Sequence, residues 1–374
     1  MDRVRMVSMA RRSRSGLTAV MGWAPLGWLW VGGHCRSRRA LCSAAMPTLR
    51  PPRPSRPRRP GRRARSGPAP ARVVVLGDLM IDVVLAAHRT LEVGTDVPGR
   101  VSLVQGGSAA NTARWLARLG ARTTLISAVG RDAAGRALVD AVRSDGVAAR
   151  IARIAGARTG RIGVLVTPDG ERSFVADRGA ADHLTPGDLR LAWFAGIDGL
   201  HLPAYSLLRE PLGLAGRRAV GLAREAGAMI SVDLASVGPL LAHGRRAARA
   251  LIADIRPDLL FATAAEAEAL AGRRFIDALL EIAPAAVIKR GAQGATVLLR
   301  EGERQLRFEV ATVSVAATDT TGAGDAFDAG FLVGWFAARS AGRSPAAALQ
   351  RAALSGHRAA ARQLSMARPE LPLA

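Results

Sequence analysis

The chain lacks most of the residues that support thiol or disulfide chemistry. Its only two cysteines, Cys35 and Cys42, lie within the first 70 of its 374 residues. The rest of the chain therefore has no disulfide framework, no thiolate metal site and no cysteine nucleophile. It also contains no Gly-x-x-x-x-Gly-Lys phosphate-binding loop, and Lys289 is its only lysine. These absences exclude thiol enzymes and Walker-type nucleotide sites.

Aromatic residues are also scarce, at 4% of the sequence with a single tyrosine, Tyr205. Because hydrophobic residues still make up 49%, the core must be built from alanine, leucine and valine. A chain of this length can hold one large α/β domain or two smaller ones.

Positive charge is abundant but concentrated at the amino end. Of the net charge of +23, residues 1–70 contribute +15, from 16 arginines and a single acid, Asp2. The remaining +8 is spread without a basic stripe, so no nucleic-acid partner is expected. The Pro/Arg run Arg50–Arg65 predicts disorder. We therefore interpret residues 1–70 as a leader outside the fold.

The sequence leaves the origin of this leader open. The uncharged stretch Gly16–Gly33 follows several arginines, as in a signal peptide or anchor, but Pro25 and its glycines interrupt it. An arginine-rich, acid-poor leader is also typical of an organelle transit peptide. In a further alternative, translation starts downstream, at about Met46. No other stretch could span a membrane, so no stable membrane association is expected.

From Ala71 onward, strand-like and helix-like segments alternate. This rhythm predicts a parallel sheet covered by helices. Strands are expected at Ala71–Leu76, Thr123–Val129, Ile197–Leu202, Met229–Asp233, Leu259–Ala262 and Ala285–Ile288, with an antiparallel pair at Thr296–Leu299 and Arg304–Val310. Helices are expected at Ala133–Ser144, Glu210–Ala226, Ala242–Ile255, Ala264–Ala271 and Pro345–Leu364.

Two other segments, about 90–104 and 159–177, predict a small β-lid. The first shows weak alternation, and the second is a hairpin around Pro168-Asp169-Gly170. Both lack long apolar runs, which suits a sheet exposed on two sides better than a core strand. Because such faces and edges invite pairing between subunits, a homodimer through the lid is expected.

The segment Asp319–Asp325, Asp-Thr-Thr-Gly-Ala-Gly-Asp, runs into an apolar helical stretch, Asp328–Ala338. Unpaired backbone N–H groups at such a helix start attract anions. A carboxylate beside an anion site can take a proton from a hydroxyl that attacks phosphorus. An ordinary capped helix, with Asp319 or Thr320 as the N-cap, is the alternative interpretation.

A second glycine motif, Gly106-Gly107-Ser108-Ala109-Ala110-Asn111, opens an amphipathic helix that runs to Leu119. The double glycine lets the backbone approach a ligand closely, and the Asn111 amide suits a polyol or a helix cap. Upstream, Asp78 and Asp82 follow the first strand. In open α/β sheets ligands bind beyond the carboxyl ends of strands, so both can meet a ligand unless they serve only a turn.

With these pieces in order, the chain resembles the ribokinase-like (PfkB) carbohydrate kinases over about residues 72–368. Gly106–Ala113 is similar to the family's first signature and Asp319–Asp325 to its second. The resemblance implies a three-layer α/β/α sandwich with a mostly parallel central sheet and a small β-lid. The kinase domain would span residues 71–368, followed by a tail at 369–374. The implied activity is cytoplasmic, ATP-dependent phosphorylation of a primary hydroxyl on a sugar or sugar acid.

The resemblance also implies roles for particular residues. Asp325 would be the general base, with the backbone N–H groups of Gly322, Ala323 and Gly324 as the anion hole. The acceptor sugar would contact Asp82, Gly106, Gly107 and Asn111. ATP would lie along Lys289, Gly291, Gly294, Thr321 and Gly324. Metal ions would lie near Glu266 and Asp319: Mg²⁺ bridging the phosphates and, in members activated by K⁺, a monovalent cation close to Asp319 and Thr321.

Two departures and two alternatives accompany this interpretation. Asp328 stands where several members have asparagine. Thr263-Ala264-Ala265-Glu266 stands where many members have Asn-x-x-Glu, so a hydroxyl replaces an amide. A nucleoside kinase of the same fold is the nearest alternative, although so few aromatic residues offer no evident slot for a base. The other is a non-catalytic sugar- or nucleotide-binding protein, against which the intact Asp325 and glycines argue. The sequence does not name the sugar.

Overall fold

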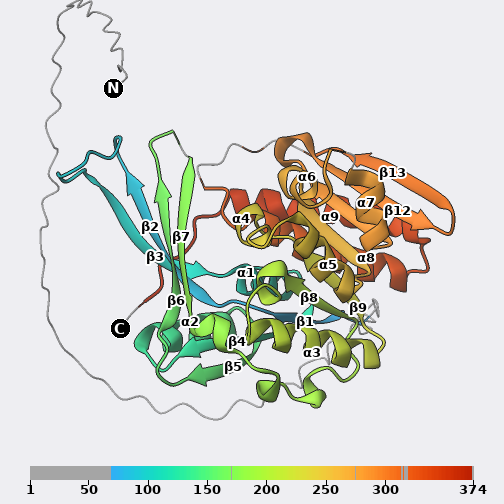
Figure 1. Cartoon of the computed structure of the whole chain (residues 1–374), viewed down its shortest axis with the longest axis horizontal. Helices are drawn as coiled ribbons and strands as arrows, with labels where there is room; N and C mark the ends of the chain where they lie inside the picture. Colours follow the sequence, from blue (N-terminus) through green and yellow to red (C-terminus); the bar gives the residue numbers. More distant parts are fainter. Residues whose placement is uncertain (1–68, 170, 274, 313–314, 316–318, 373–374) are drawn as a thin grey trace, which may run out of the picture. The chain divides into compact units, whose positions relative to one another are not determined.

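The computed structural model describes residues 69–372 except positions 170, 274, 313–314 and 316–318 (Figure 1). The interpretation of residues 1–70 as a leader lies outside this part, apart from its last two residues. Within the described ranges, no helix is long and apolar enough to cross a membrane.

The larger sheet has nine strands in the order β13-β12-β11-β10-β9-β8-β1-β4-β5. From β11 to β5 all neighbours are parallel, whereas β12 and β13 are antiparallel. The expected parallel sheet with an antiparallel pair is therefore confirmed, and β5 is a strand that the sequence did not predict. The strands are β1 (Arg72–Leu76), β4 (Arg122–Gly130), β5 (Ala148–Ile154), β8 (Gly199–Pro203), β9 (Met229–Asp233), β10 (Leu259–Thr263), β11 (Ala285–Lys289), β12 (Ala295–Glu301) and β13 (Arg304–Val310).

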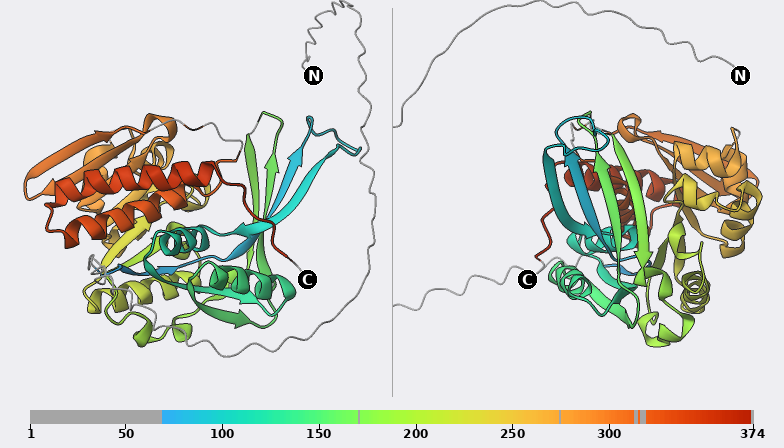
Figure 2. Two further views of the ribbon diagram at one scale, coloured as in Figure 1. Left: turned by 180° about the vertical axis from the view of Figure 1, so that it is seen from behind. Right: turned by 60° about the vertical axis from the view of Figure 1, so that its left-hand side comes forward.

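Helices cover both faces of this sheet, which completes the predicted three layers (Figures 1 and 2). One face packs against α1 (Ser108–Arg118), α2 (Ala133–Ser144), α8 (Ala323–Ser340) and α9 (Pro345–Leu364). The other packs against α3 (Leu212–Glu225), α4 (Val237–Leu240), α5 (Arg245–Ile255), α6 (Ala264–Ala271) and α7 (Phe275–Ile282). Of these helices, α4 and α7 were not predicted.

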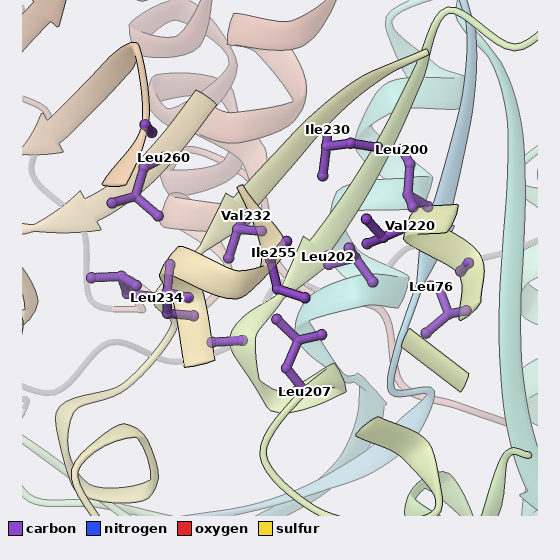
Figure 3. Close-up of a cluster of buried hydrophobic side chains, with 14 of the residues drawn as sticks. Leu76, Leu200, Leu202, Leu207, Val220, Ile230, Val232, Leu234, Ile255 and Leu260 are labelled. Carbon is purple, nitrogen blue, oxygen red and sulfur yellow. The ribbon is translucent and has the colours of Figure 1, made fainter. Parts of the chain in front are cut away.

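Strand β1 contributes side chains to the hydrophobic cores on both faces of the sheet. Successive side chains of a strand point to opposite faces. Val73 and Val75 accordingly pack in the core beneath α1 and α8, and Val74 and Leu76 pack in the core on the opposite face. Figure 3 shows part of this second core, in which leucine, isoleucine and valine from neighbouring strands and helices interlock. A continuous apolar run is what a strand buried on both faces requires.

A smaller sheet of four strands, β3-β2-β6-β7, stands beside the first (Figure 1). It consists of two antiparallel hairpins joined by a parallel pairing of β2 with β6. This confirms the predicted small second sheet, although β2 lies outside the segments expected to form it. The strands are β2 (Met80–Ala87), β3 (Gly99–Gly106), β6 (Thr159–Val166) and β7 (Arg172–Gly179).

Two details of this sheet differ from the prediction. Residues 90–98 are a connection rather than a strand; Pro98, which has no N–H to donate, closes it by accepting from the His88 N–H at 3.0 Å. Asp82, expected just beyond the carboxyl end of the first strand, lies inside β2, because the chain turns at residues 77–79 into the second sheet. Asp82 therefore belongs to the second sheet, where it is paired with Val104 of β3.

The described part of the predicted tail is attached to the second sheet. Glu370 forms a bridge with Val104, the Leu371 N–H donates to the Leu103 carbonyl at 2.7 Å, and Arg100 pairs with Glu370 at 2.9 Å. Figure 2 shows this segment crossing from the end of α9 to β3. The edge of β3 that β2 leaves unpaired is thus partly covered by the chain's own end.

Candidate active site

A cavity of about 1770 Å³ lies where the carboxyl ends of the central strands meet the second sheet. Asp233, Thr263 and Lys289, the last residues of β9, β10 and β11, all line it. Asp82 and Arg172 line it from the second sheet. Ligand sites of open α/β sheets occur at this edge, so the cavity is the candidate active site.

Asp325 lies on the cavity wall in the first turn of α8. Its Oδ1 accepts a hydrogen bond from the Ser108 hydroxyl at 2.7 Å, and its Oδ2 accepts one from the Asn111 amide at 2.9 Å. The starts of α1 and α8 therefore meet at this carboxylate. Burial raises the pKa of Asp325 to about 7, although the two hydrogen bonds act in the opposite direction. Such a group exchanges a proton near neutral pH.

The predicted anion nest is a tight turn that leads into α8. Gly322 is the N-cap, with a left-handed backbone (φ 77°) that favours glycine. The Ala323 N–H already donates to the Thr320 carbonyl at 3.2 Å, whereas the Gly324 N–H belongs to the first helical turn, which has no intrahelical acceptor. Gln363 fixes the turn from α9, because its amide donates to the Thr321 carbonyl at 3.0 Å. Gly322 and Gly324, both on the cavity wall, are the candidate anion donors.

Asp82 is buried in the wall opposite this turn. Its Oδ2 accepts from Arg368 at 2.7 Å, while its Oδ1 is buried without a partner among the described residues. Burial raises the pKa of Asp82 against the opposing effect of the Arg368 guanidinium. Gly106 makes room for this carboxylate, since a Cβ at position 106 would lie 1.8 Å from Oδ1. Gly107 is the N-cap of α1 and lines the cavity.

Lys289 is the centre of a buried charge cluster. Its Nζ lies 3.1 Å from Asp233 Oδ1 and 3.2 Å from both carboxylate oxygens of Asp328. Burial disfavours the ammonium, but the Asp233 and Asp328 carboxylates outweigh this effect and raise the pKa of Lys289. The three donors of the ammonium are therefore directed at carboxylates within the protein.

Three other residues predicted to contact ATP or a metal ion, Glu266, Gly291 and Gly294, lie in different places relative to the cavity. Glu266 lines the cavity, and its Oε2 accepts from the Thr263 N–H at 2.8 Å in a capping box that begins α6. The threonine that replaces the usual asparagine at position 263 is thus the cap of this helix. Gly291 and Gly294 lie in the turn between β11 and β12, outside the set of residues that lines the cavity.

Asp319 precedes the nest and is held by its neighbours. Its Oδ1 accepts from the Thr321 N–H at 2.9 Å, and its Oδ2 accepts from Arg368 Nε at 3.0 Å. Arg172 on β7 reaches the same turn, bonding to the Thr320 hydroxyl and lying 3.4 Å from Asp319 Oδ1. Partial burial opposes charge here, but these hydrogen bonds and guanidinium charges lower the pKa of Asp319.

Several residues of the site were not predicted as site residues. Ser108 is part of a quoted motif, but nothing in the sequence marks its hydroxyl as the partner of Asp325. Asp233 ends a predicted strand, and that position was the available signal for it. Asp328 was noted only as a departure from the family pattern, without a role in the site. Arg368 lies near the end of the chain in a segment without a pattern.

These features define a phosphotransferase-like site: a helix start that can bind an anion, a carboxylate that titrates near pH 7 and a wall of polar side chains. Comparisons with known proteins agree. Residues 70–368 match the model of the pfkB family carbohydrate kinases. The chain belongs to this family, and it is an enzyme that phosphorylates a sugar at the expense of ATP.

Individual relatives give the same result. Fructokinase-1 of Oryza sativa subsp. japonica is 33% identical over 267 residues, which cover 68% of this chain and 80% of the relative. Fructokinase-1 of Zea mays is 31% identical over 267 residues, which again cover 68% of this chain and 80% of the relative. Adenosine kinase from Sinorhizobium meliloti, a solved structure, is 26% identical with a TM-score of 0.68, covering 82% of this chain and 98% of that one. Ribokinase from Giardia lamblia, at 21% identity and a TM-score of 0.68, shares the fold over 79% of this chain and 93% of its own.

Proposed function

We propose that the enzyme phosphorylates a primary hydroxyl of a sugar, with Asp325 as the general base. The observation that carries this proposal is the position of Asp325, which joins the two signature helices beside the candidate anion donors Gly322 and Gly324. The acceptor hydroxyl would give its proton to Asp325 as its oxygen attacks the γ-phosphorus, and ADP would leave. Ser108 and Asn111 would orient the carboxylate, since each bonds one of its oxygens.

The cavity also fits Mg²⁺ that arrives with ATP. Among the described residues, no group of three or more His, Cys, Asp or Glu side chains could hold a metal on its own. Mg²⁺ in kinases is bound by one or two carboxylates together with the substrate phosphates, so a preformed cage is not required. The cavity-lining carboxylates of Asp233 and Glu266 could serve this purpose. Bound Mg²⁺ would neutralise the phosphate charge that develops during transfer.

The names of the relatives suggest which acceptors to test first. We expect fructose and related sugars to be phosphorylated faster than nucleosides, because the relatives from Oryza sativa subsp. japonica and Zea mays, 33% and 31% identical, are fructokinases. Adenosine is the second candidate, on the strength of the Sinorhizobium meliloti structure. ADP release measured over a panel of sugars, sugar acids and nucleosides tests both. A panel in which no sugar exceeds the nucleosides would contradict the proposal.

Asp82 is proposed to bind the acceptor rather than ATP. Replacing it by alanine (Asp82→Ala) should raise the KM for the acceptor about tenfold or more, because a buried polar partner worth roughly 1–3 kcal/mol is lost. The KM for ATP should stay near its original value. Steady-state kinetics with each substrate varied in turn checks this expectation.

A matched control is Asp258→Ala. Asp258 accepts from the Ile230 N–H at 2.7 Å at the opposite end of the strands, so its loss should lower the melting temperature without changing either KM. If Asp82→Ala behaves like this control, Asp82 has only a structural role. If Asp82→Ala raised only the KM for ATP, ATP rather than the acceptor would bind at this end of the cavity.

A homodimer through the second sheet remains part of the proposal. Its outer strands expose apolar side chains, among them Val101 at 65%, Phe174 at 59% and Val175 at 77%. Light scattering at micromolar concentration should give the mass of a dimer, and Val175→Glu should shift it toward the monomer. A monomer in the unaltered protein would contradict the dimer. We place the enzyme in the cytoplasm, where its proposed donor, ATP, is abundant.

A further inference from the structure

The C-terminal segment inserts one charged side chain between the two halves of the site. Arg368 donates to Asp82 Oδ2 on β2 at 2.7 Å and to Asp319 Oδ2 beside the nest at 3.0 Å. Its side chain is only 13% exposed. The bonds of Glu370 and Leu371 to β3 hold the segment on the far side of Arg368. The guanidinium is therefore fixed between the acceptor strand and the turn that precedes α8.

This placement conflicts with the monovalent-cation site that the resemblance implies at Asp319 and Thr321. A cation site needs several oxygens with free lone pairs pointing to one place. Here Asp319 Oδ1 accepts from the Thr321 N–H, Asp319 Oδ2 accepts from Arg368, and the Thr321 carbonyl accepts from Gln363. The Thr321 hydroxyl has no partner among the described residues, and one hydroxyl does not make a cation site.

The positive charges around Asp319 also disfavour a bound cation. Asp319 already faces two guanidinium groups, Arg368 at 3.0 Å and Arg172 at 3.4 Å. A further cation bound to Asp319 would lie close to both, and like charges at such short range repel strongly in a partly buried site. The donors that surround this carboxylate thus satisfy its charge as well as its hydrogen-bonding capacity.

We propose that the guanidinium of Arg368 takes the place of a monovalent cation beside the phosphate-binding turn, so that this kinase works without K⁺. Arg368 is a positioning residue: it neutralises Asp319, holds the turn in front of Gly322 and ties that turn to Asp82. The kinetic part of the inference rests on the proposed function, whereas the binding part does not.

Cation binding can be tested without any turnover. The melting temperature of the full chain is measured in KCl and in tetramethylammonium chloride at equal ionic strength. We expect the two melting curves to coincide for the unaltered protein. A K⁺-specific rise in its melting temperature would show an occupied cation site and overturn the proposal, even if the enzyme proved to act on an unexpected substrate.

Variants then test whether the charge of Arg368 matters. Arg368→Met keeps the length of the side chain but removes the charge, whereas Arg368→Lys retains a charge. The control is Arg118→Met, which breaks an ion pair of 2.8 Å between Arg118 and Asp145. Neither of these two residues lines the cavity. We expect turnover of the unaltered enzyme and of the control to be the same in both salts.

Arg368→Met should lose turnover in tetramethylammonium and regain at least about fivefold in K⁺, the range expected of a coupled effector site. Arg368→Lys should keep more turnover than the methionine variant in tetramethylammonium. Fivefold activation of the unaltered enzyme by K⁺ would contradict the proposal. So would an Arg368→Met variant that is fully active without K⁺, or lysine and methionine variants that behave alike.

Discussion

Replacing Asp325 by asparagine is expected to reduce turnover by about 10²–10⁴-fold, the usual contribution of a general base. Asparagine has the same shape and can still bond to Ser108 and Asn111, but it cannot accept a proton from the acceptor hydroxyl. ATP should still bind, because the backbone donors of the nest do not depend on this side chain. Initial rates at saturating ATP and sugar measure the effect.

The melting curve separates loss of catalysis from loss of structure. Burial raises the pKa of Asp325 to about 7, above its unfolded value, so the folded protein holds a proton that the unfolded chain releases. The wild-type protein therefore loses stability as the pH rises from about 4 to 7, and the uncharged asparagine avoids this cost. Above pH 7 the variant should melt no lower than the wild type.

Asp140→Asn is the matched control for this experiment. It makes the same chemical change at an exposed carboxylate on α2, whose side chain is 77% exposed. Its turnover should equal that of the wild-type enzyme. Near-normal turnover of Asp325→Asn would remove Asp325 from the proposed mechanism.

Replacing Lys289 by methionine should lower stability by roughly 3–5 kcal/mol, the cost of breaking a buried ion pair. The substitution leaves the buried carboxylates of Asp233 and Asp328 without their cation. Chemical denaturation of the variant and the wild-type protein measures the difference. Arg118→Met, which breaks a less buried pair with Asp145, should cost no more than about 1 kcal/mol.

The double variant Lys289→Met/Asp328→Leu sharpens this test. Removing Asp328 as well eliminates one of the two unpaired carboxylates, so we expect it to recover part of the lost stability. If Lys289 instead acts mainly on the phosphates of ATP, Lys289→Met would raise the KM for ATP and leave stability almost unchanged. That outcome would contradict the structural role that its three carboxylate contacts indicate.

The sequence predicted those parts of the structure that have a local pattern. Eight of the nine strands of the larger sheet follow from apolar runs that alternate with amphipathic segments, whereas β5 was missed. Helices α9 and α6 begin and end where their patterns predict. The nest was predicted, and remains a prediction, because small residues before a helix have a local physical meaning. The lid connection at 90–98 was wrongly assigned, because weak alternation alone does not reveal which residues find a pairing partner.

Contacts between distant residues could not be predicted in this way. Arg368 meets Asp82 across 286 positions of the chain, and Ser108 meets Asp325 across 217. No local pattern encodes such pairs, because they depend on how complete layers pack. For the same reason Lys289, placed along the phosphates of ATP from the resemblance, is found directed at Asp233 and Asp328.

The pH dependence of kcat/KM for the acceptor tests the central claim most directly, because it reports the ionisation of groups in the enzyme before the acceptor binds. It should be measured from about pH 5.5 to 8.5 at saturating Mg²⁺ and ATP. Since Asp325 must be deprotonated to act as a base, kcat/KM should rise with pH, bend at about 7 and then level off. The residual activity of Asp325→Asn should lack this bend. A wild-type profile that is flat across this range, or a bend at the same pH in Asp325→Asn, would contradict the assignment of Asp325 as the general base.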